Sequence, residues 1–278
     1  MKINLAKSAG FCFGVRRAFA IALKTARDRK KVFMLGEIVH NEDVARQIRK
    51  AGIKKITCLG EGCGKTLLLR AHGTRLKTLN EAKRRGYKII DATCPMVKHI
   101  HRIVKEMDYK GYVIIVIGDK KHDEVYGITG QLKNKTIVID PAQRIPFKKI
   151  KGIKKACIVV QSTQNEEKVF KIIGAVAPNF RELKFFNTIC APTKIKQKEI
   201  KEMPLGNDVM LIIGSKTSAN TKRLYEISKS LNKNTYWVDK KEKITRRWFK
   251  NAKNVGISAG ASTPDWIIKD ICAYIAEF

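Results

Sequence analysis

The feature that most constrains the fold of this chain is an internal repeat that relates three cysteines to three glycines. Three apolar runs end in glycine, at residues 32–36, 113–118 and 209–214. A cysteine stands 24 residues before each of these glycines, at Cys12, Cys94 and Cys190. A repeated spacing of this length predicts that the chain consists of several similar structural units.

The segment between each cysteine and its glycine changes from helical periodicity to a β-rich apolar run. We therefore predict helices over residues 15–29, 96–109 and 195–203. Pro95 follows Cys94 directly and Pro192 stands two residues after Cys190, and proline favours the first turn of a helix. Each cysteine is expected to precede a helix N-terminus, where free N–H groups and the helix dipole stabilise a thiolate.

A second strand-like run follows in each repeat and ends in small or polar residues, at 67–73, 158–163 and 255–263. Alternating strands and helices predict parallel α/β units, whose ligands bind beyond the carboxyl ends of the strands. We predict three pseudo-equivalent units, over residues 1–93, 94–189 and 190–278, with residues 1–11 as a candidate extra strand of the third. Units that share one centre would bring the three repeat cysteines together.

Three thiolates from three distant segments can bind a metal centre that only the fold assembles. Ordinary iron–sulfur carriers use four cysteines, so three would leave one iron open to substrate, as a catalytic zinc keeps one position open. The pattern therefore favours a reactive iron–sulfur centre. A zinc or electron-transfer protein with a fourth ligand from elsewhere in the chain is an alternative.

The other four cysteines do not share the repeat position. The seven cysteines form no dense framework of the kind that disulfides staple in secreted proteins. Cys58 and Cys63 have a C-x4-C spacing, but no second pair or nearby histidine completes a zinc site. We interpret Cys58, Cys63, Cys157 and Cys272 as buried small apolar residues.

Polar side chains follow the predicted strands and suit an anionic ligand. The residue four positions after each repeat glycine is His40, His122 or Ser218, and His72 ends another strand-like run. Imidazole groups, joined by the polar groups of Ser218, Asn220 and Ser262, would suit a diphosphate. Glu124 is the carboxylate best placed to deliver a proton, provided that burial raises its pKa.

The net charge of +32 over 278 residues favours binding of polyanions, and a basic nucleic-acid-binding protein is the alternative function. The sequence contains no recognisable nucleic-acid-binding motif, which argues against specific binding. Lysines at 147–155 and 194–201 alternate with apolar residues, as on solvated faces. No apolar run reaches the ~18 residues of a membrane span, and the first motif begins by Ala9, so we expect a cytoplasmic protein with no membrane contact.

Eight segments together resemble the 4-hydroxy-3-methylbut-2-enyl diphosphate reductase family, also called the IspH or LytB family. They are AGFCFGV at 9–15, EIVHN at 37–41, RAHG at 70–73, DATCP at 91–95, HDEVYG at 122–127, NTIC at 187–190, GSKTSAN at 214–220 and AGASTPD at 259–265. The resemblance runs in order along essentially the whole chain. It implies reductive dehydroxylation of the hydroxymethylbutenyl diphosphate to isopentenyl and dimethylallyl diphosphates, the last step of the methylerythritol phosphate pathway.

The resemblance also implies a trefoil of three α/β domains around a central [4Fe–4S] cluster. Cys12, Cys94 and Cys190 would be its ligands, with one iron open, and Glu124 would be the proton donor. The diphosphate would be held by His40, His72, His122, Ser218, Asn220 and Ser262. A ferredoxin or flavodoxin would supply electrons, and a monomer is expected.

The sequence departs from the family pattern at two positions. The family's QTT reads QST at 161–163, which puts Ser162 in the substrate site where a threonine hydroxyl would help orient the substrate oxygen and the acid. Serine keeps the hydroxyl but lacks the methyl that restrains a threonine rotamer. We expect function to survive this change. Ala219 stands where the family often has serine, so backbone N–H groups would have to replace one side-chain contact to the diphosphate.

Overall fold

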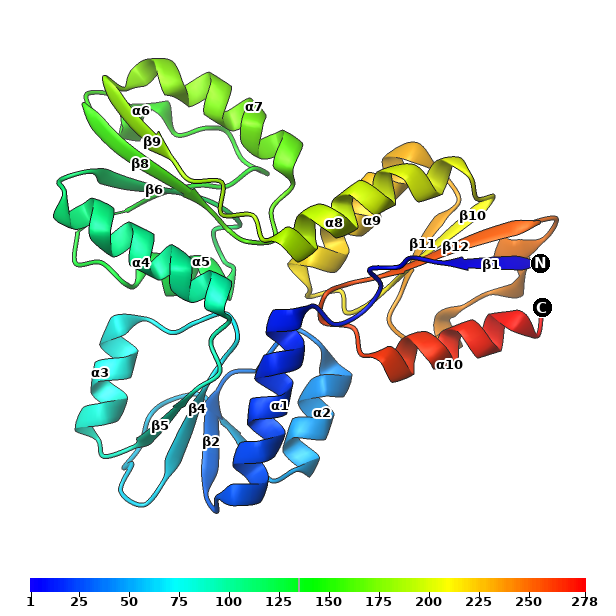
Figure 1. Ribbon diagram of the computed structural model, residues 1–278, viewed down its shortest axis with the longest axis horizontal. Helices are drawn as coiled ribbons and strands as arrows, with labels where there is room; N and C mark the ends of the chain where they lie inside the picture. Colours follow the sequence, from blue (N-terminus) through cyan, green and yellow to red (C-terminus); the bar gives the residue numbers. More distant parts are fainter. Residues whose placement is uncertain (135) are drawn as a thin grey trace. The chain divides into compact units, whose positions relative to one another are not determined.

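The computed structural model describes residues 1–134 and 136–278, which form two compact bodies. The C-terminal body comprises Met1–Arg16, Val39–Ala45 and Cys190–Phe278. The central body comprises Arg17–Ile38 and Arg46–Ile189. Three four-stranded parallel sheets are distributed over the two bodies, one in the C-terminal body and two in the central body (Figure 1). The prediction of an α/β fold with parallel sheets is therefore confirmed.

The sheet of the C-terminal body has the order β1-β12-β10-β11. Its strands are β1 (Lys2–Leu5), β10 (Val209–Ile213), β11 (Thr235–Val238) and β12 (Asn254–Ala259). Three helices accompany it, α8 (Ala191–Glu202), α9 (Ala219–Leu231) and α10 (Asp265–Ala276). Short 3-10 helices cover Met203–Leu205, Lys241–Lys243 and Arg246–Phe249.

Strand β10 shows why this sheet is buried on both faces. Leu211 and Ile213 belong to one apolar cluster with Ile271 of α10, whereas Met210 and Ile212 belong to another with Leu224 of α9. Successive side chains of a strand point to opposite faces, so an uninterrupted apolar run is expected where helices cover both faces.

The central body contains the other two sheets and their helices. One sheet has the order β3-β2-β4-β5, and the other has the order β7-β6-β8-β9. The strands are β2 (Val32–Leu35), β3 (Lys54–Ile56), β4 (Thr66–Leu69), β5 (Lys88–Asp91), β6 (Val113–Ile117), β7 (Ile137–Ile139), β8 (Lys155–Val160) and β9 (Glu182–Phe185). The helices that lie wholly in this body are α3 (Leu76–Arg84), α4 (Pro95–Tyr109), α5 (Asp123–Thr129), α6 (Phe147–Ile150) and α7 (Glu166–Val176), with a 3-10 turn at Ala177–Asn179. Helices α1 (Phe13–Asp28) and α2 (Glu42–Lys50) belong to it from Arg17 and from Arg46 onward.

The three sheets share one strand order. Written so that corresponding strands align, the orders are β3-β2-β4-β5, β7-β6-β8-β9 and β11-β10-β12-β1. The N-terminal strand β1 therefore occupies the position in the third sheet that β5 and β9 occupy in the other two. It pairs in parallel with β12, from Lys2 opposite Asn254 to Leu5 opposite Ile257. The predicted apolar runs are the inner strands β2, β6 and β10 and their neighbours β4, β8 and β12.

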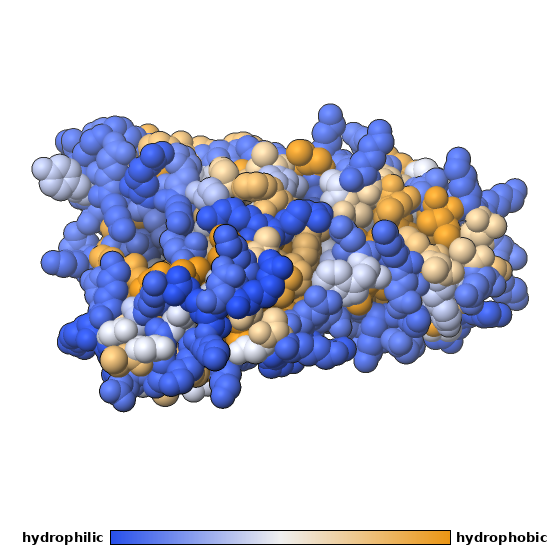
Figure 2. All heavy atoms as spheres, turned by 60° about the horizontal axis from the view of Figure 1, so that its bottom comes forward, coloured by the Kyte–Doolittle hydropathy of each residue, from blue (hydrophilic) through white to orange (hydrophobic). Residues whose placement is uncertain are grey.

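The face of the molecule seen in Figure 2 is predominantly polar. Figure 2 shows hydrophilic residues over most of the visible face, with apolar residues scattered between them. In the described part of the chain, no helix combines the length and apolar character that crossing a membrane requires.

Candidate functional site

Each repeat cysteine directly precedes a helix. Cys94 and Cys190 are the N-cap residues of α4 and α8, and Cys12 precedes α1. The three backbone carbonyls accept bonds from the N–H groups four residues later, at 2.9 Å for Cys12, 3.0 Å for Cys94 and 3.1 Å for Cys190. In the described part of the chain none of the three forms a disulfide, and all three residues are partly exposed. The local structure therefore gives the three cysteines one common setting, directly before the first turn of a helix.

In the C-terminal body, a buried cation accompanies Cys12 and Cys190. Lys196 of α8 is only 2% exposed. Burial lowers the pKa of Lys196 to about 8, although the negative charges of Cys12, Glu199 and Cys190 oppose this shift. The expectation that residues 194–201 form a solvated face is therefore wrong for Lys196. Its ammonium points inward because backbone carbonyls bind it there, including that of Ala259 at 3.1 Å.

A second group of polar side chains in the C-terminal body surrounds the start of α9. Ser218 caps this helix by accepting a bond from the Thr221 N–H at 3.3 Å. Ser262 donates to the carbonyl of His40 at 3.1 Å and lies 3.4 Å from the Ser218 hydroxyl. Ala219 begins the helix without a polar side chain.

Asn220 is the strongest sign of a ligand in this body. It is 4% exposed, and neither atom of its side-chain amide has a hydrogen-bond partner among the residues that the structure describes. An unsatisfied buried amide is costly, so its retention beside Ser218 points to a polar ligand that would complete its bonding.

In the central body, His72 and His122 form an edge-to-face pair with ring centroids 5.4 Å apart. His122 caps α5, and its Nδ1 accepts a bond from the Glu124 N–H at 3.1 Å. An Nδ1 that accepts places the proton of a neutral ring on Nε2, so this nitrogen acts as a donor.

Cys94 is linked to the segment that carries His72. Its N–H donates to the carbonyl of Ala71 at 3.0 Å. The chain turns after His72 at Gly73, which has a φ of +84° and lies against the ring of His101. Burial lowers the pKa of His101 to about 4, and the nearby charge of Lys105 acts in the same direction.

Glu124 and Ser162 form a buried acid–hydroxyl pair in the central body. The Ser162 N–H donates to one carboxylate oxygen at 2.6 Å, and its hydroxyl donates to the other at 2.8 Å. Burial raises the pKa of Glu124 to about 7, although both Ser162 bonds oppose the shift and the charge of Asp119 adds to it. Serine thus keeps the hydroxyl contact, and the carboxyl group can carry a proton near neutral pH.

The predicted site residues fall into two groups. Cys12, Cys190, His40, Ser218, Ala219, Asn220 and Ser262 lie in the C-terminal body, where the Cys12 N–H donates at 3.1 Å to Ala261, the neighbour of Ser262. Cys94, His72, His122, Glu124 and Ser162 lie in the central body.

Sequence reasoning missed two residues of α8 that lie near Cys190. The Thr193 hydroxyl is 3.2 Å from the Cys190 sulfur, and Lys196 follows one turn later. The three-residue spacing from Cys190 to Thr193, and again from Thr193 to Lys196, is the signal that could have found them, since residues about one turn apart are neighbours on a helix.

The remaining cysteines fulfil the prediction only in part. Cys157 is buried in an apolar cluster, and Cys272 packs half-buried against the core of the C-terminal body. Cys58 and Cys63 are exposed, so the prediction that they are buried is wrong. They lie in the loop between β3 and β4, where no apolar element covers them.

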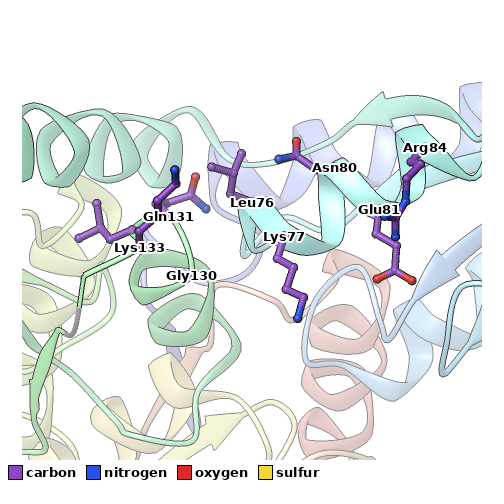
Figure 3. Close-up of a pocket in the computed structure, with 9 residues that line it drawn as sticks. Leu76, Lys77, Asn80, Glu81, Arg84, Gly130, Gln131 and Lys133 are labelled. Carbon is purple, nitrogen blue, oxygen red and sulfur yellow. The ribbon is translucent and has the colours of Figure 1, made fainter.

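A separate cavity lies between α3 and the loop after α5. Figure 3 shows Lys77, Glu81 and Arg84 on its helical side and residues 130–133 on the other. None of its described lining residues is a predicted site residue, and we assign no chemistry to it.

Comparison with known protein families matches residues 3–276 to the family described as LytB protein. Among curated proteins, the 4-hydroxy-3-methylbut-2-enyl diphosphate reductase of Aquifex aeolicus is 41% identical and covers 99% of this chain and 96% of its own length. The enzyme of the same name from Geobacter sulfurreducens is 38% identical, with coverage of 100% and 98%.

Two solved structures are similar over nearly the whole chain. The structure of (E)-4-hydroxy-3-methyl-but-2-enyl diphosphate reductase, the terminal enzyme of the non-mevalonate pathway, has a TM-score of 0.75 at 38% identity and covers all of both chains. The E-1-hydroxy-2-methyl-but-2-enyl-4-diphosphate reductase from Plasmodium falciparum has a TM-score of 0.88 at 24% identity, covers 99% of this chain and 87% of its own, and supports the fold. With residues 3–276 matched and full-length relatives near 40% identity, this chain belongs to the LytB family.

Proposed function

We infer that this chain is a 4-hydroxy-3-methylbut-2-enyl diphosphate reductase that catalyses the terminal step of the non-mevalonate pathway to isoprenoids. The observation that carries this function is the family match over residues 3–276, because it includes every segment with a candidate site residue. The reaction replaces a C–O bond of the substrate by a C–H bond, consumes two electrons and two protons, and releases water.

We propose that Cys12, Cys94 and Cys190 hold a [4Fe–4S] cluster at the centre of three α/β units, over residues 1–93, 94–189 and 190–278. Three half-exposed thiols, each before a helix N-terminus, fit such a group. When bound, the cluster supplies electrons and one iron without a cysteine ligand.

We propose that the diphosphate is bound by His40, His72, His122, Ser218, Asn220 and Ser262, with backbone N–H groups at Ala219. The unpartnered amide of Asn220 at the start of α9 supports this role, because helix N-termini and buried donors favour phosphate oxygens. The paired rings of His72 and His122 add donors that can carry positive charge.

We propose that Glu124 donates the proton with which the substrate hydroxyl leaves as water. A carboxyl group with a pKa of about 7 is protonated in half of the molecules at that pH and is a strong enough acid to give the proton up. Ser162 fixes the orientation of both carboxylate oxygens. The electron donor is a ferredoxin or flavodoxin, and the enzyme acts as a monomer.

Anaerobic purification followed by iron and sulfide analysis tests the cluster, and turnover of the substrate with a reduced donor tests the activity. Glu124→Gln is expected to keep the cluster spectrum and to lose about 100-fold or more in turnover. Glu202→Gln, an exposed change on α8, is the matched control and should behave as wild type. A colourless protein after anaerobic reconstitution would overturn the cluster, and full turnover by Glu124→Gln would remove Glu124 as the acid.

A further inference from the structure

Helix α8 carries two charged residues that hold the segment leading to Cys12. Lys196 and Glu199 lie six and nine residues after Cys190, the N-cap of the same helix. The Lys196 ammonium donates to the backbone carbonyl of Ser8 and, at 3.1 Å, to that of Ala259 at the end of β12. One buried side chain thus connects the Cys190 helix, the segment before Cys12 and the central part of the sheet.

The Glu199 carboxylate accepts hydrogen bonds from backbone N–H groups of the same segment. One carboxylate oxygen accepts from the Lys7 N–H at 2.6 Å, and the other accepts from the Ser8 N–H at 3.1 Å and from the Ser8 hydroxyl. Ser8 is therefore held through its carbonyl by Lys196 and through its two donors by Glu199.

The Cys12 segment is fixed from its other side by strand β12 and the loop that follows it. The Ala6 N–H donates to Ile257 at 2.8 Å, and the Cys12 N–H donates to Ala261 at 3.1 Å. Within the C-terminal body, the position of Cys12 relative to Cys190 is thus set jointly by these backbone bonds and by the contacts of α8 with residues 7 and 8.

Hydrogen bonds to two carbonyls do not by themselves explain why the buried residue at position 196 is a charged lysine. A buried ammonium is costly unless opposite charge compensates it. The negative charges that act on Lys196 are those of Cys12, Glu199 and Cys190. Two of these three are proposed cluster ligands, which carry a thiolate charge when a cluster is bound.

We propose that Lys196 and Glu199 are positioning residues for the iron–sulfur centre. Together they fix the Cys12 segment to the helix that begins at Cys190, and the Lys196 ammonium adds a positive charge that acts on the two thiolates. The inference rests on the proposed cluster. Residues around metal ligands typically change metal affinity 10–100-fold when they are replaced, and net charge near a cluster sets its reduction potential.

The test compares Lys196→Met, Lys196→Arg and Glu199→Gln with wild type and with Lys198→Met, which removes an exposed lysine of the same helix. Each protein is reconstituted anaerobically, and its iron content, its rate of iron loss to a chelator and the reduction potential of its cluster are measured. Thermal melting of the metal-free chains reports folding separately.

We expect Lys196→Met to lose iron about tenfold faster than wild type and to have a more negative reduction potential. Glu199→Gln should also lose iron faster, because an amide cannot accept all three bonds of the carboxylate. Lys196→Arg keeps the charge and the donors, so its reduction potential should be closer to that of wild type than the potential of Lys196→Met. Lys198→Met should change neither the rate of iron loss nor the reduction potential.

The outcomes separate this proposal from the proposed function. If wild type binds a cluster and Lys196→Met matches it in iron loss and potential, the positioning role is wrong. If Lys196→Met does not fold without metal, Glu199→Gln and Lys196→Arg decide the question by the same two measurements. If wild type itself binds no iron after reconstitution, the proposed function fails instead.

Discussion

The buried carboxyl group of Glu124, the proposed acid, makes the stability of the central body depend on pH. Its pKa is raised from 4.5 to about 7, chiefly by burial. The folded protein therefore holds this proton between about pH 4.5 and pH 7, whereas the unfolded chain has released it. Because the folded state binds more protons in this window, the contribution of Glu124 to the free energy of unfolding falls as pH rises from 4.5 to 7.

Glu124→Gln removes this titration while keeping a side chain of the same shape. We expect the variant to melt at a higher temperature than wild type at about pH 8, and this difference to shrink toward about pH 5. Thermal unfolding of both metal-free proteins over this range measures it. A difference that does not change with pH would show that Glu124 does not titrate with a raised pKa.

At the scale of single residues, the sequence predicts positions better than contacts. The spacing to the repeat glycines singles out Cys12, Cys94 and Cys190, and the helix starts confirm their equivalent settings. The bond between Glu124 and Ser162 joins residues 38 apart, from the start of α5 and the end of β8, so only the assembled sheet reveals it. The burial of Lys196 was equally hidden, because it depends on where residues 7 and 8 lie.

At the scale of elements, the inner strands are predictable because helices cover both faces and require apolar runs. The outer strands β3, β7 and β11 are shorter or carry polar residues, and β3 reads Lys-Lys-Ile with both lysines exposed. Edge strands of three or four residues give too short a pattern to be recognised from the sequence. The sequence makes residues 1–11 a candidate extra strand of the third unit, but local patterns do not specify the register in which β1 pairs with β12.

The turn after β4 requires a backbone conformation at Gly73 that favours glycine, which a substitution can test. Its φ of +84° is unfavourable for residues with a side chain, and an added Cβ would lie 2.7 Å from the ring of His101. Gly73→Ala should therefore combine a backbone penalty of about 1–2 kcal/mol with a steric clash beside His72. Gly64 has a φ of +69° with nothing within 4 Å of an added Cβ, so Gly64→Ala is the matched control.

Thermal melting should place Gly73→Ala clearly below Gly64→Ala, and Gly64→Ala modestly below wild type. The interval between the two variants measures the packing of Gly73 against His101 apart from its backbone conformation. Equal melting temperatures would mean that the His101 ring moves aside at no cost.

At the scale of the whole molecule, the net charge of +32 is the property that local structure explains least. Salt bridges such as Lys98–Asp91 and Lys155–Glu182 use some of the 25 acidic residues, but 57 basic residues leave most positive charge uncompensated. Excess charge of one sign acts at long range on any acidic partner.

The charge gives a test of the proposed electron donor. Raising ionic strength from about 0.01 M to about 0.15 M shortens the screening length from about 30 Å to about 8 Å. If an acidic ferredoxin or flavodoxin delivers the electrons, kcat/KM for the reduced donor should fall steeply over this range, while turnover with a small artificial reductant should change much less.

Duplex DNA as a competitor separates the two functions that the charge allows. A reductase whose charge steers its donor should lose turnover with the protein donor when DNA covers the surface, should keep turnover with the small reductant, and should recover as salt releases the DNA. A specific nucleic-acid-binding protein should instead prefer one sequence over another at the same salt concentration. Turnover with the acidic donor that does not respond to salt would show that contact at short range, rather than the long-range field of the lysines and arginines, brings donor and enzyme together.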